Sequence, residues 1–178
     1  MQKGKIAYGN LASLHSNYYN VITIIEKRLD KNYNIYNASQ EADKKGELSV
    51  IKSYIIDTES NEQLGKHFKV KEFACKDGSP VVFIDEYLWT VLDILRTKVG
   101  RPVIVTSGYR TPDWNKKTGG AKYSYHMRGM AADIRVNGMT PKQVASKLSE
   151  IVPDECGIIV YKSWVHFDVR TSKYRKGV

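Results

Sequence analysis

The sequence predicts an α+β domain in which a small antiparallel sheet is flanked by helices. Two observations lead to this class. From residue 65 onward, helix, strand, loop, strand, helix and strand patterns follow one another without the regular alternation of a parallel α/β fold. The strand patterns are also short and rich in β-branched residues, as expected for a small sheet with one buried face.

Length and composition limit the possibilities further. The chain has 178 residues, which is enough for one ordinary domain with an extension, and 42% apolar and 26% charged residues exclude wholesale disorder. No apolar run approaches the roughly 20 residues that a membrane span needs. Residues 1–5 start a basic N-terminus that no apolar segment follows, so no cleaved secretory signal is predicted. Two cysteines are too few for a disulfide framework and fit a reducing compartment.

The first 64 residues are predicted to form an N-terminal extension, and they contain no motif of catalytic or metal-binding residues. Apolar residues recur at three- and four-residue steps over residues 11–30, which predicts an amphipathic helix. Residues 32–46 are polar and predict a loop. We therefore expect an extension over residues 1–64, helical in part and of unknown function, and a separate domain over residues 65–178.

The first half of that domain has clear boundary signals. Asp77-Gly78 predicts a turn after a short segment that starts at Phe68. Asp85 can cap a helix that stops at Gly100. Residues 102–107 then predict a buried strand, and residues 108–125 predict a long irregular stretch, which in a compact domain is more often functional than idle.

Two more strands and a helix complete the domain. Residues 133–136 and 164–170 alternate polar and apolar side chains. In the second strand the alternation sends Val165, Phe167 and Val169 to one face and the polar residues to the other. Between the two strands, Thr140-Pro141 predicts the start of a helix, with threonine as the cap and proline at the first position.

Three polar residues of this half could share a metal ion. His126 and Asp133 face each other if the chain doubles back near residues 128–129, and a neighbouring strand can deliver His166. Two imidazoles and one carboxylate are a suitable donor set for zinc with one coordination position left open, as catalytic zinc requires. Taken alone, this constellation is a weak signal, because two histidines and an aspartate can be found in most sequences and a lone histidine is more often structural.

The residues around this constellation resemble a known family. Residues 124–133 (SYHMRGMAAD) match the pattern SxHxxGxAxD of the LAS metallopeptidases, a group that includes lysostaphin-type enzymes, D-Ala-D-Ala peptidases and the hedgehog signalling domain. Residues 107–112 (SGYRTP), 119–122 (GGAK) and 164–168 (WVHFD) look like the zinc D-Ala-D-Ala carboxypeptidase branch. The resemblance covers roughly residues 68–170 and implies a hedgehog- or D-Ala-D-Ala peptidase-like fold.

The resemblance also implies roles for individual residues. His126, Asp133 and His166 would hold zinc, with water in the fourth position. Arg110 matches the family arginine that steadies the substrate carbonyl or the negative charge developing on it, although it could instead only anchor its loop. Ser124 matches a position that contacts the peptide substrate in related dipeptidases, and it could equally be a turn residue.

One part of the family pattern is missing. Many members place a carboxylate three residues before the last zinc histidine as general base, and others place a histidine two residues before it. Here those positions are Ser163 and Trp164, neither of which takes a proton from water at neutral pH. Asp168 lies on the same strand face as His166 and is our candidate base, with orientation of His166 as its alternative role.

These inferences predict a zinc metallopeptidase that hydrolyses an amide bond in the peptide part of bacterial peptidoglycan, as a carboxypeptidase or an endopeptidase. The alternative is an inactive zinc-binding structural or wall-binding module on the same fold. The formal net charge of +9 favours an anionic partner such as the cell wall. Nucleic-acid binding rests on charge alone, without a recognition motif. The absent signal suggests a cytoplasmic product that reaches the wall after holin-type release, as a phage or prophage endolysin, or as a phage component. The oligomeric state is not predicted.

Overall fold

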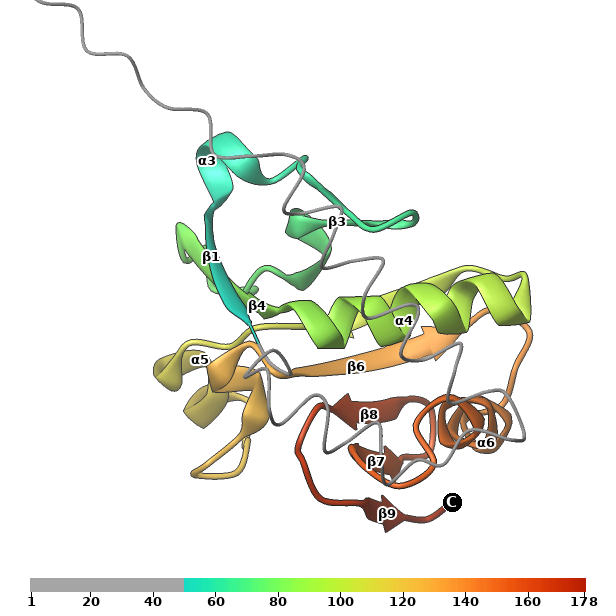
Figure 1. The fold of residues 1–178 in the computed structure, drawn as a ribbon. Coiled ribbons are helices and arrows are strands. Elements are labelled where there is room, and N and C mark those ends of the chain that lie inside the picture. The colour runs from blue at the N-terminus through green and yellow to red at the C-terminus, as the bar shows by residue number, and fades with distance from the viewer. Residues whose placement is uncertain (1–49) are drawn as a thin grey trace, which may run out of the picture.

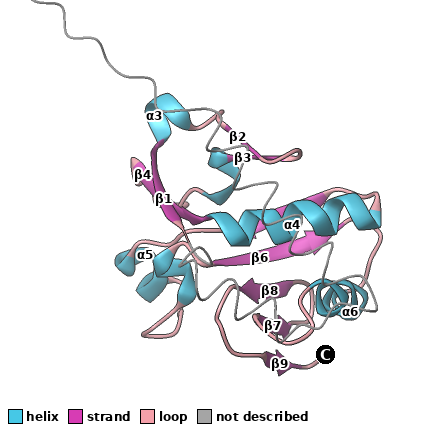
Figure 2. Ribbon diagram, viewed as in Figure 1, coloured by secondary structure: helices cyan, strands magenta, loops and turns pink. Residues whose placement is uncertain are grey.

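The computed structural model of this chain describes residues 50–178, which form nine strands, four α-helices and two 3₁₀ helices (Figures 1 and 2). In chain order the elements are β1 (Ile51–Ile55), α3 (Ile56–Glu59), β2 (Gln63–Leu64), β3 (Phe68–Lys69), η1 (Val70–Phe73), β4 (Val81–Asp85), α4 (Glu86–Val99), β5 (Val103–Ser107), α5 (Pro112–Lys117), η2 (Tyr125–Arg128), β6 (Ala131–Val136), α6 (Pro141–Ile151), β7 (Gly157–Val160), β8 (Val165–Asp168) and β9 (Tyr174–Lys176). The predicted helix over residues 11–30 and loop over residues 32–46 lie outside the described residues.

A five-stranded sheet forms the centre of the domain. Its strand order is β5-β6-β8-β7-β9, and the pairs from β5 to β7 are all antiparallel, which confirms the predicted α+β class with a small antiparallel sheet. β9 differs, because it joins the sheet parallel to β7. Two short two-stranded sheets, β1-β4 and β2-β3, lie outside this central sheet.

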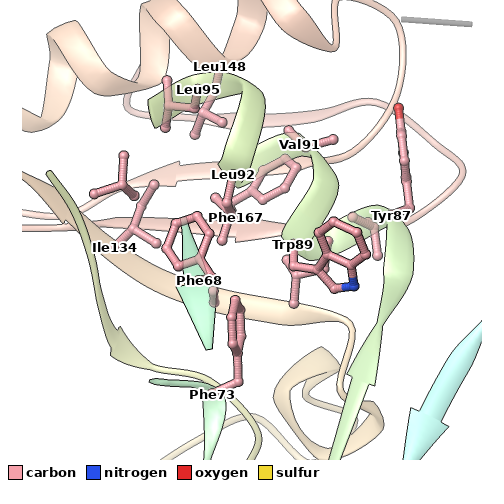
Figure 3. Close-up of a cluster of buried hydrophobic side chains, with 14 of the residues drawn as sticks. Phe68, Phe73, Tyr87, Trp89, Val91, Leu92, Leu95, Ile134, Leu148 and Phe167 are labelled. Atoms are coloured by element: carbon pink, nitrogen blue, oxygen red, sulfur yellow. The ribbon is translucent and has the colours of Figure 1, made fainter. Parts of the chain in front are cut away.

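The alternation of side chains along the central strands separates a buried face from a polar face. Ile134 on β6 and Phe167 on β8 are fully buried, and they join one apolar cluster with Leu92 and Leu95 of α4 and Leu148 of α6 (Figure 3). Helices α4 and α6 therefore cover one face of the sheet. The predicted inward positions Val165, Phe167 and Val169 are confirmed, and the intervening polar residues are left to the opposite face.

Both long helices start where the sequence predicts, and α4 also ends where it predicts. The carboxylate of Asp85 accepts a hydrogen bond from the amide of Tyr87 at 2.8 Å, and α4 ends at Gly100 with a left-handed φ of 61°. At the start of α6, Thr140 and Gln143 form a reciprocal capping box, and Pro141 occupies the first helical position. These caps fix the two helices that support the sheet.

Residues 51–64 pack with the predicted domain. β1 pairs with β4 along its whole length, from Ile51 opposite Asp85 to Ile55 opposite Val81. Tyr54 and Leu64 are buried in the same apolar cluster as the central sheet. We therefore propose that the domain boundary lies N-terminal to β1 rather than between residues 64 and 65.

The stretch predicted to be irregular, residues 108–125, contains one short helix. The hydroxyl of Thr111 accepts a hydrogen bond from the amide of Trp114, and Pro112 follows the cap at the first helical position of α5. The same Thr-Pro signal starts α6, but the sequence analysis predicts a helix only at Thr140-Pro141 and not at Thr111-Pro112. None of the helices described over residues 50–178 is long and apolar enough to cross a membrane.

Candidate metal centre

The three predicted metal ligands come together on the polar face of the sheet. His126 lies in η2, which the left-handed Gly129 ends at a φ of 72°, so the chain reverses there and enters β6. On β6, Asp133 lies directly opposite His166 of β8. The predicted reversal near residues 128–129 thus brings His126 and Asp133 to the same place, and strand pairing adds His166.

The three donor atoms form a nearly equilateral triangle. His126 Nε2 lies 3.1 Å from His166 Nδ1, His166 Nδ1 lies 3.0 Å from Asp133 Oδ1, and His126 Nε2 lies 3.3 Å from Asp133 Oδ1. Zinc–nitrogen distances of about 2.0–2.1 Å in a tetrahedral site set neighbouring donors about 3.3 Å apart. The spacing therefore fits one zinc ion held by three protein ligands.

The outer nitrogen of each histidine faces a hydrogen-bond acceptor. His126 Nδ1 donates to the carbonyl of Gly108 at 2.7 Å, and His166 Nε2 donates to Asp168 Oδ2 at 3.1 Å. We assign the protons to these nitrogens because a carbonyl and a carboxylate can only accept. The inner nitrogens then keep their lone pairs for a metal, which is the usual arrangement around zinc-binding histidines.

The carbonyl that orients His126 belongs to a tightly packed backbone. A Cβ atom at residue 108 would lie 2.5 Å from the carbonyl oxygen of Phe73, so only glycine fits there. The next amide, of Tyr109, donates to that same carbonyl at 2.8 Å, and the amide of Arg110 donates to the carbonyl of His126 at 3.1 Å. The start of the long loop is therefore bonded to η1 on one side and to η2 on the other.

A β-bulge in β5 positions the predicted arginine. The pairing with β6 shifts between Val105 and Ser107, so Thr106 is an extra residue and Ser107 faces Asp133. The hydroxyl of Ser107 accepts a hydrogen bond from Arg110 Nε at 2.9 Å, and Arg110 Nη2 donates to Asp133 Oδ2 at 2.6 Å. The structure therefore brings Arg110 to the metal centre, where it contacts the carboxylate oxygen that is turned away from the histidines.

Asp168 is fully buried, and both of its oxygens are occupied. Arg170 donates to Oδ1 from Nε at 2.6 Å and to Oδ2 from Nη2 at 2.7 Å, while His166 donates to Oδ2. The Arg170 guanidinium itself lies between the rings of Tyr125 and Tyr174, 4.8 and 4.7 Å from their centroids. Of the two roles that we considered for Asp168, these contacts favour orientation of His166 over that of a general base.

The charges of the site stabilise one another. Burial alone would raise the pKa of Asp133, but in the metal-free protein the hydrogen-bonding and electrostatic interactions with His126 and His166 outweigh burial and hold that pKa well below its usual range. Burial also opposes ionisation of Asp168, yet the bonds from His166 and Arg170 lower its pKa. Burial lowers the pKa of His166, but the hydrogen bonds and charges of Asp133 and Asp168 raise it by more. The pKa of His166 is therefore higher than usual. Both carboxylates are thus ionised at neutral pH.

The remaining predicted residues lie at the edges of the site. The hydroxyl of Ser124 accepts a hydrogen bond from the amide of His126 at 3.3 Å and caps η2, which is the turn role that we left open. The hydroxyl of Ser163 accepts from Arg135 Nη2 at 3.3 Å. Trp164 stacks on Tyr161 with the ring centroids 4.7 Å apart. Neither Ser163 nor Trp164 supplies the base that the family pattern places there.

Sequence reasoning gave no role to Arg170 or to the Gly108 carbonyl. The alternation of residues 164–170 already places Arg170 on the same face as Asp168, and a charged pair at a two-residue spacing on one strand is a readable signal. The Gly108 carbonyl leaves no comparable signal, because any residue has a carbonyl and only the packing shows which one faces His126.

The small sheet carries a His-Asp-His donor set that could hold a metal ion through three protein ligands. The family model named Peptidase M15 matches residues 66–168, and this match spans all three donors. The chain therefore belongs to the M15 peptidases, a family of zinc-dependent metallopeptidases. A comparison with curated proteins found no match.

Proposed function

We propose that this protein hydrolyses an amide bond in the peptide part of bacterial peptidoglycan, with zinc held by His126, Asp133 and His166. The observation that carries the proposal is the donor triangle with sides of 3.0–3.3 Å, in which both imidazoles are oriented from behind by acceptors. When bound, zinc would activate a water molecule near neutral pH and polarise the scissile carbonyl.

The chain's own residues would contribute orientation and charge. Arg110 is half-buried beside Asp133, and its permanently charged, forked donors suit a carbonyl oxygen on which negative charge develops. Asp168 and Arg170 would hold the ring of His166 in one tautomer. Ser124 stays a candidate for contact with the peptide substrate, besides capping η2.

The wall context of the activity rests on charge and on the resemblance. A net charge of +9 would concentrate the protein on anionic wall polymers, and this attraction weakens as salt is added. We propose that the protein acts as an endolysin of a phage or prophage, or as a phage component, and reaches the wall after holin-type release. The N-terminal extension, predicted over residues 1–64, would then serve as a wall-targeting or assembly element.

Purified cell walls provide the direct test. We expect the zinc-loaded full-length protein to reduce wall turbidity and release new amino termini, and a chelator to abolish both. The Asp133→Asn variant should be inactive, whereas Asp154→Asn, which removes an exposed carboxylate that is not part of the donor triangle, should match the parent. Release that continues in the presence of chelator would contradict the zinc mechanism.

The second candidate function is a zinc-binding module without activity on the same fold. It is favoured by Ser163 and Trp164 at the usual positions of the base, and by His166 and Arg170, whose hydrogen bonds occupy both oxygens of Asp168. Stoichiometric zinc binding, together with wall binding but no new amino termini, would establish this function instead.

A further inference from the structure

One arginine on the polar face of the sheet has no part in the metal centre described above. Arg135 follows Asp133 by two residues on β6, while Ile134 and Val136 between and beyond them are buried in the core. Strand alternation therefore places Arg135 on the same face as Asp133, displaced along the strand by about 6.8 Å. Its side chain is exposed.

The neighbours of Arg135 across the strands form a row parallel to the metal ligands. On β5, Ile104 pairs with Arg135 and is 44% exposed. On the other side, the pairing of Ile134 with Val165 places Trp164 opposite Arg135, and Trp164 stacks on Tyr161. We call these four residues the outer row: Ile104, Arg135, Trp164 and Tyr161.

Arg135 has no carboxylate partner among the described residues, unlike Arg110 and Arg170, the other two arginines of this face. Arg110 and Arg170 each bind an aspartate, at 2.6 Å in both cases. Arg135 donates only to the neutral hydroxyl of Ser163 at 3.3 Å, and it forms no ion pair within residues 50–178. Its charge is therefore available to an anionic ligand that approaches this face.

We propose that the outer row binds the substrate residue that follows the scissile bond, and that Arg135 binds a carboxylate of that residue. This inference rests on the proposed function, because it takes the donor triangle as the place where the scissile carbonyl lies. One extended residue spans about 3.4 Å, which fits between the triangle and Arg135 with room for a polar contact at each end.

The composition of the outer row favours a small residue with a carboxylate over a phosphate polymer. A polymer of phosphates is bound by several cations along its path, whereas the outer row has one guanidinium flanked by apolar side chains. A guanidinium fork matches a carboxylate with two parallel hydrogen bonds, and the exposed Ile104 and Tyr161 can cover the apolar part of the residue.

The carboxylate has two sources that an experiment can separate. It is the C-terminal carboxylate if the enzyme is a carboxypeptidase, and the side-chain carboxylate of an internal acidic residue if the enzyme is an endopeptidase. Three synthetic peptides of one parent sequence distinguish these cases: one ends in D-Ala-D-Ala with a free carboxylate, one has the same end amidated, and one is amidated with an acidic residue after the scissile bond.

Cleavage of the three peptides by the zinc-loaded full-length protein gives the test. We expect the parent to prefer one carboxylate-bearing peptide over the neutral amide by about 10- to 100-fold in kcat/KM, as for a charge-assisted hydrogen bond. Arg135→Gln should remove this preference, so that the acid and amide peptides are cleaved with similar kcat/KM, and Arg135→Lys should restore part of it. Lys162→Gln, which removes an exposed charge from the neighbouring turn, should keep the full preference.

Two results would overturn the inference while leaving the proposed function intact: equal cleavage of all three peptides, or a carboxylate preference that survives in Arg135→Gln. If no peptide is cleaved and walls are not degraded, the proposed function fails. Calorimetric binding of the same peptides then decides the inference separately. Carboxylate-dependent binding that is lost in Arg135→Gln supports it, and equal affinities for acid and amide contradict it.

Discussion

His166 lies between two aspartates, Asp133 and Asp168, whose carboxylate oxygens have different hydrogen-bond partners. Asp133 contacts Nδ1 of the ring and Asp168 contacts Nε2, and each aspartate also binds an arginine. In Asp133, one oxygen binds Arg110 and the other lies in the donor triangle with two imidazole nitrogens. In Asp168, both oxygens are bonded to Arg170 and the residue is fully buried.

Both aspartates carry the same charge, so charge does not distinguish them. They differ in whether a carboxylate oxygen remains available to a metal ion. Asp133 keeps one oxygen for an ion and is a metal ligand in our assignment. Both oxygens of Asp168 accept hydrogen bonds from Arg170, so we propose that Asp168 orients the ring of His166. The predictions that follow test this contrast, starting with the largest expected effect.

The strongest contrast comes from removing the proposed ligand. We expect Asp133→Ala to lower zinc affinity by well over the roughly 100-fold that marks the upper end for an outer-shell partner. The loss of the anion also leaves Arg110 without its ionic partner. Titration of the metal-free protein with zinc against a chromogenic chelator measures the affinity. A parent-like zinc affinity in this variant would contradict the assignment of Asp133.

Removing only the charge of the second aspartate should have a smaller effect. In Asp168→Asn we expect zinc affinity to fall by about 10- to 100-fold, because the amide orients His166 less firmly. Turnover at saturating zinc should recover in large part. If Asp168 were instead the general base, zinc affinity would be unchanged and turnover lost at every zinc concentration, so the two measurements separate the two roles.

The burial of Asp168 can be tested from the neighbouring strand. Gly157 lies opposite Asp168, and a Cβ atom at Gly157 would lie 2.2 Å from its Oδ2 atom. Because Arg170 and His166 hold that oxygen in place, we expect Gly157→Ala to cost about 1–3 kcal/mol in the free energy of unfolding. Urea denaturation measures this cost, and it should be much smaller when Gly157→Ala is made in an Asp168→Ala background.

Acid should lower the free energy of unfolding of the metal-free protein, because Asp133 and Asp168 become protonated. Their pKa values are lower in the folded protein than the value of about 3.9 expected when unfolded. Their contribution to stability is therefore present above about pH 4 and is lost as the pH falls through the folded pKa values. Urea unfolding of chelator-treated protein at pH 5, 4 and 3 should show this loss. The Asp168→Asn variant should lose less stability than the parent over the same range.

Much of this structure could be predicted from local sequence signals. The caps Asp85 and Thr140 placed both long helices, and the alternation in residues 164–170 separated the buried face from the polar one. The matched family model agrees with the zinc-peptidase resemblance that the motif over residues 124–133 suggested.

The remaining features depend on contacts between segments that are distant in sequence. The sequence analysis predicts no strand at β1 or β9, and both strands are defined by their pairing with β4 and β7. The bulge at Thr106 is defined by its partner strand. In the same way, sequence placed Asp168 beside His166, but only the bidentate contact with Arg170 shows that its oxygens are occupied.

The backbone bonds of residues 108–110 have a consequence for how the site moves. The amides of Tyr109 and Arg110 donate to the carbonyls of Phe73 and His126, so this segment cannot detach without breaking contacts to η1 and η2. We expect these two amides to exchange with deuterium as slowly as those of the central strands, since only large-scale unfolding frees them. The backbone behind His126 would then keep its position while an ion binds or leaves.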